Sequence, residues 1–159
     1  MPSGTEGLVE AWRVNNRINL FLLDRITDAG MASTTSTRGG RNVARQFAHL
    51  HNNRVDFLMH HAPRDLSEGI VKFEGSYSPT KEELKTALES SAESIARLIE
   101  HSMNQGGTIR AFRRGVFAAF GYLVAHDSHH RGSILLTLKL TGNKLDSDAQ
   151  YLIWDWNNR

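Results

Sequence analysis

Apolar residues recur at three- and four-residue steps along much of the chain, which is the period of an amphipathic helix. Between Leu8 and Ala29 the repeating positions are Ala11, Val14, Ile18, Phe21 and Leu22. Gly30 follows this stretch, and we expect it to end the first helix. A second helix is predicted from about Asn42 to His61, because Pro63 lies just beyond and cannot continue a helix.

Capping residues mark where the next two helices begin and end. Thr80 and Glu83 have the spacing of a capping box and predict the start of a third helix, which ends between Asn104 and Gly107. A fourth helix is expected from about Arg110 to Leu140, where Gly142 closes it. Its length predicts a long central element with a bend before it.

The remaining segments add little regular structure. Ser147 and Gln150 again have capping-box spacing and predict a short fifth helix, which presents Tyr151 and two tryptophans. The connector from Glu68 to Ser78 has room for a short strand. Because the connectors are too short for a second domain, we expect residues 1–159 to form a single all-α domain. Its predicted architecture is an antiparallel four-helix bundle with a short C-terminal helix.

Composition excludes several classes of protein. The 159 residues contain no cysteine, so disulfides, thiolate zinc sites and a cysteine nucleophile are absent, and a catalytic thiol would come from a substrate. A net charge of +2 argues against nucleic-acid binding, and Arg110, Arg113 and Arg114 form the one basic cluster. The longest apolar stretch, Val116 to Ala125, is too short to span a membrane. Met1 to Glu10 has no secretory signal, so a cytoplasmic location is expected.

Histidines carry the candidate chemistry, since five of the eight fall in two tight groups. His126 and His130 are four residues apart, and on a helix such side chains lie on one face and can bind one ion. A third ligand must come from another helix, and we select His49. Three neutral imidazoles suit Zn, Ni, Cu or Fe and leave a coordination position open, as catalytic sites do.

Spacing alone leaves other ligand sets open. His126 could pair with His129, three residues later, and helical periodicity places His51 closer than His49 to the apolar positions of the second helix. The three other histidines are interpreted as surface or hydrogen-bonded residues: His60, His61 and His101.

Polar side chains continue the histidine face of the fourth helix. Tyr122 lies one turn before His126, while Ser133 and Thr137 lie one and two turns after His130. Buried polar groups need partners, and a metal with its waters would provide them. Asp127 and Arg131, also four apart, are predicted to form an ion pair on the helix surface.

Four segments resemble the DinB family, also called YfiT-like putative metalloenzymes. The segments are F-A-H-L-H-N-N-R (47–54), G-Y-L-V-A-H-D-S-H-H-R-G-S-I (121–134), K-L-T-G-N-K-L-D (139–146) and Y-L-I-W-D-W (151–156). The similarity extends from about Val9 to Trp156. It implies a four-helix bundle, commonly dimeric, and a metal held by His49, His126 and His130.

The resemblance also implies a range of activities, including S-transfer with bacillithiol or mycothiol. We therefore expect a divalent metal, Zn or Ni, and a low-molecular-weight thiol that the metal holds as a thiolate, with a small molecule as substrate. Tyr122 would donate a proton, and Arg131 or the basic cluster would contact the thiol's carboxylates. Two alternatives are a metal-dependent hydrolase and a non-enzymatic, stress-associated metal-binding protein. A homodimer is expected, with Tyr151 to Trp156 as a candidate interface.

Overall fold

The computed structural model describes residues 3–159, and this part of the chain is helical with no β-strand. Four long helices pack against one another, and two short α-helices and two 3-10 turns join or follow them. The elements are α1 (Gly4–Arg25), α2 (Asp28–Ala32), α3 (Val43–His61), η1 (Arg64–Leu66), α4 (Lys81–Asn104), α5 (Gly115–Leu140), α6 (Ser147–Leu152) and η2 (Trp156–Asn158).

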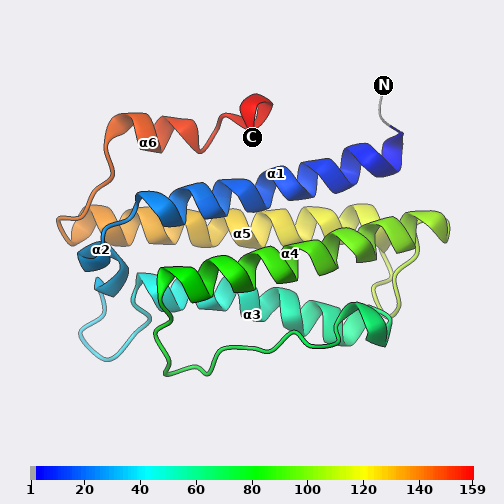
Figure 1. Ribbon diagram of the computed structural model, residues 1–159, viewed down its shortest axis with the longest axis horizontal. Helices are drawn as coiled ribbons and strands as arrows, with labels where there is room; N and C mark the ends of the chain where they lie inside the picture. Colours follow the sequence, from blue (N-terminus) through cyan, green and yellow to red (C-terminus); the bar gives the residue numbers. More distant parts are fainter. Residues whose placement is uncertain (1–2) are drawn as a thin grey trace.

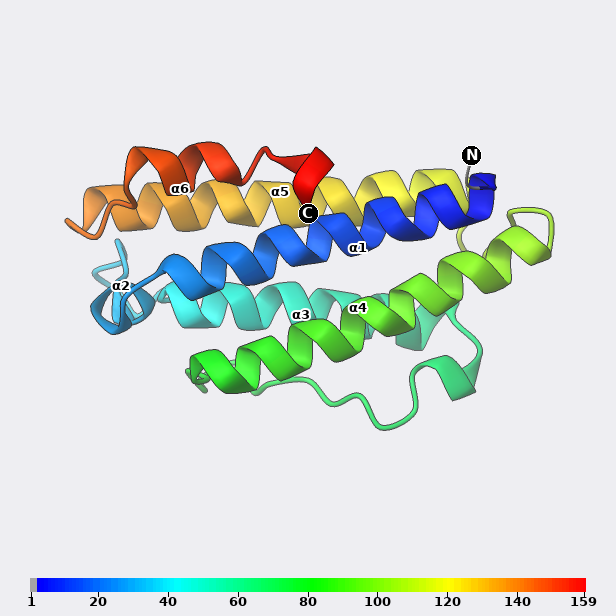
Figure 2. The same ribbon diagram turned by 45° about the horizontal axis from the view of Figure 1, so that its top comes forward.

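The long helices form two pairs that run in opposite directions. Helix α1 lies against α4 and α5, and α3 also lies against both. Figures 1 and 2 show that α1 and α5 run one way while α3 and α4 run the other way. The neighbours α1 and α4, and likewise α3 and α5, are therefore antiparallel. Because α3 and α4 are parallel, the chain from 62 to 80 returns along the length of the molecule.

The helix ends agree in part with the sequence predictions. Thr80 and Glu83 form the predicted capping box of α4, and α3 ends at His61. The first helix ends at Arg25 and not at Gly30, because Thr27 accepts a hydrogen bond from Gly30 N and starts α2 there.

The fourth long helix begins later than predicted, at Gly115, because the chain before it forms a tight turn. Gly107 and Gly115 both have positive φ, and a Cβ on Gly115 would lie 2.6 Å from Gly107 O. The amide of Val116 donates to the same carbonyl at 2.9 Å. Only glycine fits at position 115, so the turn fixes where α5 starts.

The connector between α3 and α4 has no strand, although room for one was expected. Instead, side chains of α3 bond its backbone. Asn52 donates to Phe73 O and accepts from Phe73 N, at 2.8 and 2.9 Å, so one amide side chain pairs as a neighbouring strand would. These bonds hold the connector against α3.

The interior consists of two apolar clusters with a polar layer between them. One cluster contains Trp12, Phe57, Ile95 and Leu123, and the other contains Leu22, Leu50, Leu88 and Ile134. On every long helix, some buried polar residues fall in sequence between the members of these two clusters, and they make up eight of the twelve buried polar residues. Those polar residues are Asn15, Asn16, Asn19, His51, Arg54, Ser91, Asp127 and Arg131.

The C-terminal segment packs against α1, and Leu135 of α5 contributes to the same contact. Ile153 packs against Val14 and Ile18 of α1. The guanidinium of Arg159 lies 3.8 Å from the centre of the Phe21 ring. In the part of the chain that the structure describes, no helix combines the length and apolar character that crossing a membrane requires.

Candidate metal site

Three histidines from two antiparallel helices come together in one group. His49 comes from the middle of α3, and His126 and His130 come from successive turns of α5. One ring nitrogen of each lies within 4.8 Å of one ring nitrogen of the others. The ring centres are 5.3 Å apart for His49 and His126, and 4.6 Å apart for each of the other two pairs. The structure therefore brings together the three predicted ligands.

The neighbouring histidines lie outside this group. His51 is fully buried, and its two ring nitrogens lie 2.9 Å from Ala87 O and 3.0 Å from Val71 O. The periodicity correctly indicated that His51 faces the interior, but it is a core residue there. His129 is exposed and stacks edge-on against His130. Of His49 and His51, only His49 thus joins the group, and of His129 and His130, only His130 does.

The remaining histidines lie elsewhere, as predicted. His60 is exposed, with its Nδ1 2.7 Å from Asp56 O. His61 is partly buried, and its Nδ1 lies 2.9 Å from Arg110 O. Neither belongs to the three-histidine group.

All three candidate ligands are held in the neutral form. Burial, followed by the repulsion of nearby cations, lowers the pKa of His49, and burial is also the main cause of the lowered pKa of His126. Burial together with the two neighbouring imidazoles lowers the pKa of His130 to about 4. Neutral imidazole is the form that binds a metal, so the site is ready for an ion at neutral pH.

Unpaired polar atoms around the histidines fit a bound ion. His126 Nδ1 is buried and has no hydrogen-bond partner. Gln46 and Asn53, which flank His49 on the same face of α3, bury one amide atom each without a partner. Unpaired buried polar atoms cost free energy, and a cluster of them indicates a missing ligand or water. Three imidazoles without a carboxylate are a donor set typical of Zn, Ni, Cu or Fe.

Two charged residues near the site were not singled out from the sequence. The positive charge of Arg41 contributes to the lowered pKa of both His49 and His130, so its guanidinium acts directly on the site. Asp56 has the opposite effect on the pKa of His49, but its carboxylate pairs with Lys72 at 2.8 Å. Arg41 lies just before α3, where no periodicity or motif could mark it.

Tyr122 borders the site, one turn before His126. Its ring centre is 6.3 Å from that of His126, and the ring stacks on Phe57 at 6.0 Å. The hydroxyl donates to Asn53 Oδ1 at 3.4 Å and is close to solvent, since the side chain is 46% exposed. The predicted role of Tyr122 as a proton donor stays a prediction.

Further along the same face of α5, Thr137 bonds within the protein. Its hydroxyl donates to Ser133 O at 2.9 Å and accepts from Gln46 Nε2 at 3.2 Å. The polar face predicted for α5 is therefore shared between the metal site and an ordinary hydrogen-bonded contact with α3.

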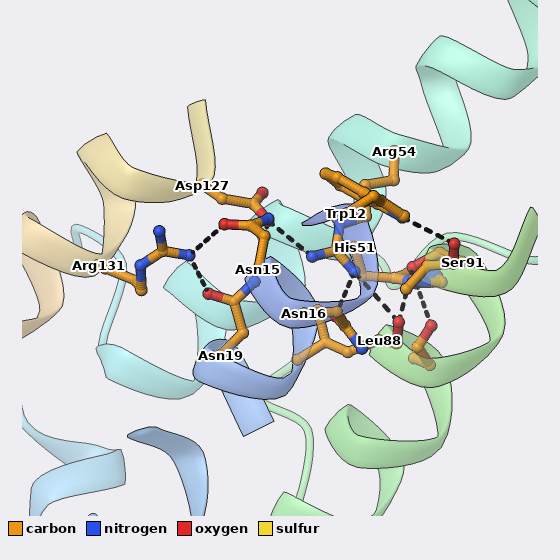
Figure 3. Close-up of polar contacts among 12 residues, drawn as sticks. Trp12, Asn15, Asn16, Asn19, His51, Arg54, Leu88, Ser91, Asp127 and Arg131 are labelled. Carbon is orange, nitrogen blue, oxygen red and sulfur yellow. Dashed lines mark hydrogen bonds and ion pairs between the residues drawn. The ribbon is translucent and has the colours of Figure 1, made fainter. Parts of the chain in front are cut away.

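Asp127 and Arg131 do not form the predicted surface ion pair, because both are buried in the polar layer. Asp127 accepts from Arg54 at 2.7 Å and from Asn15 and Asn19 of α1 at 2.8 and 2.9 Å. Arg131 donates to the same two asparagines, which bridge it to Asp127 (Figure 3). Contact of Arg131 with a substrate stays a prediction.

This polar network holds the helices that carry the histidines. Asp127 and Arg131 each directly follow one of the α5 histidines, and Arg54 lies on α3 with His49. The Arg54 guanidinium also donates to Asn16 and to Leu88 O, so one side chain ties α3 to α1, α4 and α5 (Figure 3). The network therefore fixes the register of α3 against α5 at the level of the site.

Comparison with protein-family models, curated proteins and solved structures finds no match to this chain. The fold and the site define an all-helical protein with three histidines that could hold a metal ion.

Proposed function

We propose that the chain is a DinB-like metalloprotein, with the four-helix bundle and the divalent metal site of that family. The supporting sequence motif is H-x-x-x-H-R-G at 126–132. The observation that carries the proposal is the convergence of His49, His126 and His130. Zn or Ni is the expected ion, because neutral imidazoles suit both.

The activity that we propose is metal-dependent transfer of a small thiol to an electrophilic small molecule. An ion at this site supplies the charge that keeps a bound thiol as the nucleophilic thiolate. The chain has no cysteine, so the thiol is a cosubstrate of the bacillithiol or mycothiol type. The positive charge of Arg41 acts on the site, so this residue attracts the carboxylates of such a thiol. The exposed hydroxyl of Tyr122 serves as the proton donor.

Metal content tests the first part of this proposal. Protein prepared without a His-tag should hold about one equivalent of metal per chain. His49→Ala, His126→Ala and His130→Ala should each weaken binding sharply, by about tenfold or more. His60→Ala should not change it, because this exposed side chain lies outside the group. Equal binding by all four variants would remove the metal site from consideration.

Turnover tests the second part. Metal-loaded protein should conjugate monochlorobimane with bacillithiol or mycothiol, with chloride as the leaving group. With an α,β-unsaturated ketone, whose adduct takes up a proton after the thiolate adds, Tyr122→Phe should slow turnover while leaving metal affinity unchanged. Failure with bacillithiol, mycothiol and glutathione alike would contradict thiol transfer without affecting the metal site. Arg41→Ala should raise the KM for the thiol, and Arg38→Ala, from the same exposed loop, is its control.

Hydrolysis ranks below thiol transfer because the three-histidine group contains no carboxylate to act as a base. The two carboxylates whose charges act on the site histidines, Asp56 and Asp127, are paired with Lys72 and Arg54. Turnover of an ester, amide or phosphate substrate that requires the metal would reverse this ranking. A purely structural metal remains the non-enzymatic alternative.

The proposed assembly is a homodimer. Tyr151 and Trp154 are 77% and 72% exposed, so these aromatic side chains do not pack within the chain. Large exposed aromatic residues are typical of protein interfaces. In analytical ultracentrifugation the protein should sediment as a dimer and Trp154→Glu as a monomer. A monomer at every concentration would dispose of this proposal.

A further inference from the structure

A cavity lies beside the last turns of α3 and α4. These two helices end at the same end of the molecule (Figure 1). The volume of the cavity is about 680 Å³, within the range of roughly 300–1,000 Å³ that small-molecule sites occupy. The walls come from the end of α3, the connector around η1, the last turns of α4 and the turn before α5. It is separate from the histidine site, since His49 and His61 are twelve positions apart on α3, about 18 Å along the helix.

A buried hydroxyl in the cavity wall has no partner. Ser102 lines the cavity and is only 1% exposed, yet its Oγ makes no hydrogen bond. The Ser102 carbonyl accepts a hydrogen bond from the Gly107 amide at 2.8 Å, so this backbone group has a partner while the side-chain hydroxyl has none. A buried hydroxyl without a partner costs free energy, which a ligand that bonds it would recover.

Basic side chains line the same cavity. The guanidinium of Arg64 and the ring of His101 line it and make no hydrogen bond within residues 3–159. Arg110 is fixed at the wall, because its guanidinium donates to His60 O and Ala62 O at 3.2 and 3.4 Å. Glu68 is the one acidic residue of the lining, so two arginines outnumber it.

Part of the lining is apolar and includes Met59, Ile70, Leu98 and Ile109, next to the polar Ser67, Gln105 and Thr108. Apolar walls combined with a few polar groups at fixed points are typical of sites for small organic molecules. We propose that this cavity binds a small amphipathic carboxylate, whose acid group pairs with Arg64 and bonds Ser102, and whose hydrocarbon body lies against the apolar wall.

Phenylbutyrate and the matched neutral alcohol phenylbutanol test this site. In amide NMR spectra of the full chain, phenylbutyrate should shift the resonances of residues 101–110 in a saturable way. Phenylbutanol should bind at least about tenfold more weakly, because it lacks the charge. Equal affinity for the two probes, shifts centred on 151–156, or no saturable shift up to the solubility limit would each overturn the proposal.

Two variants make the test specific to the cavity. Arg64→Ala should weaken phenylbutyrate binding about tenfold. Arg113→Ala should leave it unchanged, because this exposed arginine lies nearby in sequence but does not line the cavity. An equal loss in both variants would indicate a general charge effect and overturn the site.

Ser102→Ala separates a ligand-binding role from a structural one. If the hydroxyl serves a ligand, its removal should weaken phenylbutyrate binding several-fold, while the Tm of the free protein stays the same or rises, because the unpaired group is lost. A lower Tm with unchanged binding would show that Ser102 is structural and would contradict the proposal.

Discussion

At the scale of single residues, two histidines separated by a single residue have opposite environments. His49 is partly buried and faces α5, whereas His51 lies in the interior against two backbone carbonyls. The sequence could predict that one of them joins His126 and His130, but not which one. Burial and donor chemistry are different requirements, and the apolar periodicity reports only burial.

The two histidines should therefore respond differently to substitution. His51→Ala should lower the free energy of unfolding by roughly 2–4 kcal/mol, because it empties a buried site and leaves a polar contact unmade. It should leave the metal affinity of the folded protein unchanged. His49→Ala should leave the free energy of unfolding nearly unchanged and should weaken metal binding. Urea unfolding and metal titration of both variants check this, and a stable His51→Ala that has lost its metal would contradict the assignment.

The lowered pKa values of the histidines shape the pH dependence of metal binding. Protons compete for each ring nitrogen below the pKa of that histidine, which lies below the ordinary imidazole value in all three and is about 4 for His130. Loss of affinity should therefore begin at a lower pH than the ordinary imidazole value of about 6.5, and affinity should fall further toward 4 as His130 is protonated. Metal titration across this range checks it, and a half-loss of affinity at or above 6.5 would contradict it.

The metal-free protein should also lose stability in this window. Between about 6.5 and 4 the unfolded chain binds protons that the folded histidines do not. The full stability is thus present above 6.5 and declines as the pH falls toward 4. Urea unfolding of metal-free protein at several pH values measures the slope, and His130→Ala should make it shallower.

At the scale of helices, local signals predicted the ends of α3 and the start of α4, because capping residues and Pro63 act within a few positions. The start of α5 escaped prediction, because it depends on the contact of Gly115 with Gly107 across a turn. The polar layer was not predicted from the sequence either. In the sequence, Asn15 and Asn19 resemble surface residues, and only their partners on α5 account for their burial.

Asp127 is the acidic centre of that layer and should be its most sensitive member. Asp127→Asn keeps the shape but leaves Arg54 and Arg131 as two buried cations without a counter-charge. We expect a loss of about 3–5 kcal/mol of unfolding free energy, as for other broken buried ion pairs. Denaturant unfolding measures it, and a loss below about 1 kcal/mol, the range of surface pairs, would contradict the network.

At the scale of the whole molecule, the apolar clusters are complete without the metal site. Neither of the two large clusters includes His49, His126 or His130, and the helices they join are also tied by Arg54. The fold thus has its own sources of stability. The histidines add a region with unpaired polar atoms, which by itself costs free energy.

Metal removal should therefore leave the helices in place. After chelation, far-UV circular dichroism should show the helical signal retained and unfolding still cooperative. The Tm should be lower than that of metal-loaded protein, because an ion bound only by the folded state stabilises it. Returning Zn or Ni should restore the original Tm. Conversely, collapse of the helical signal on chelation would mean that the metal is structural, and it would favour the non-enzymatic alternative over catalysis.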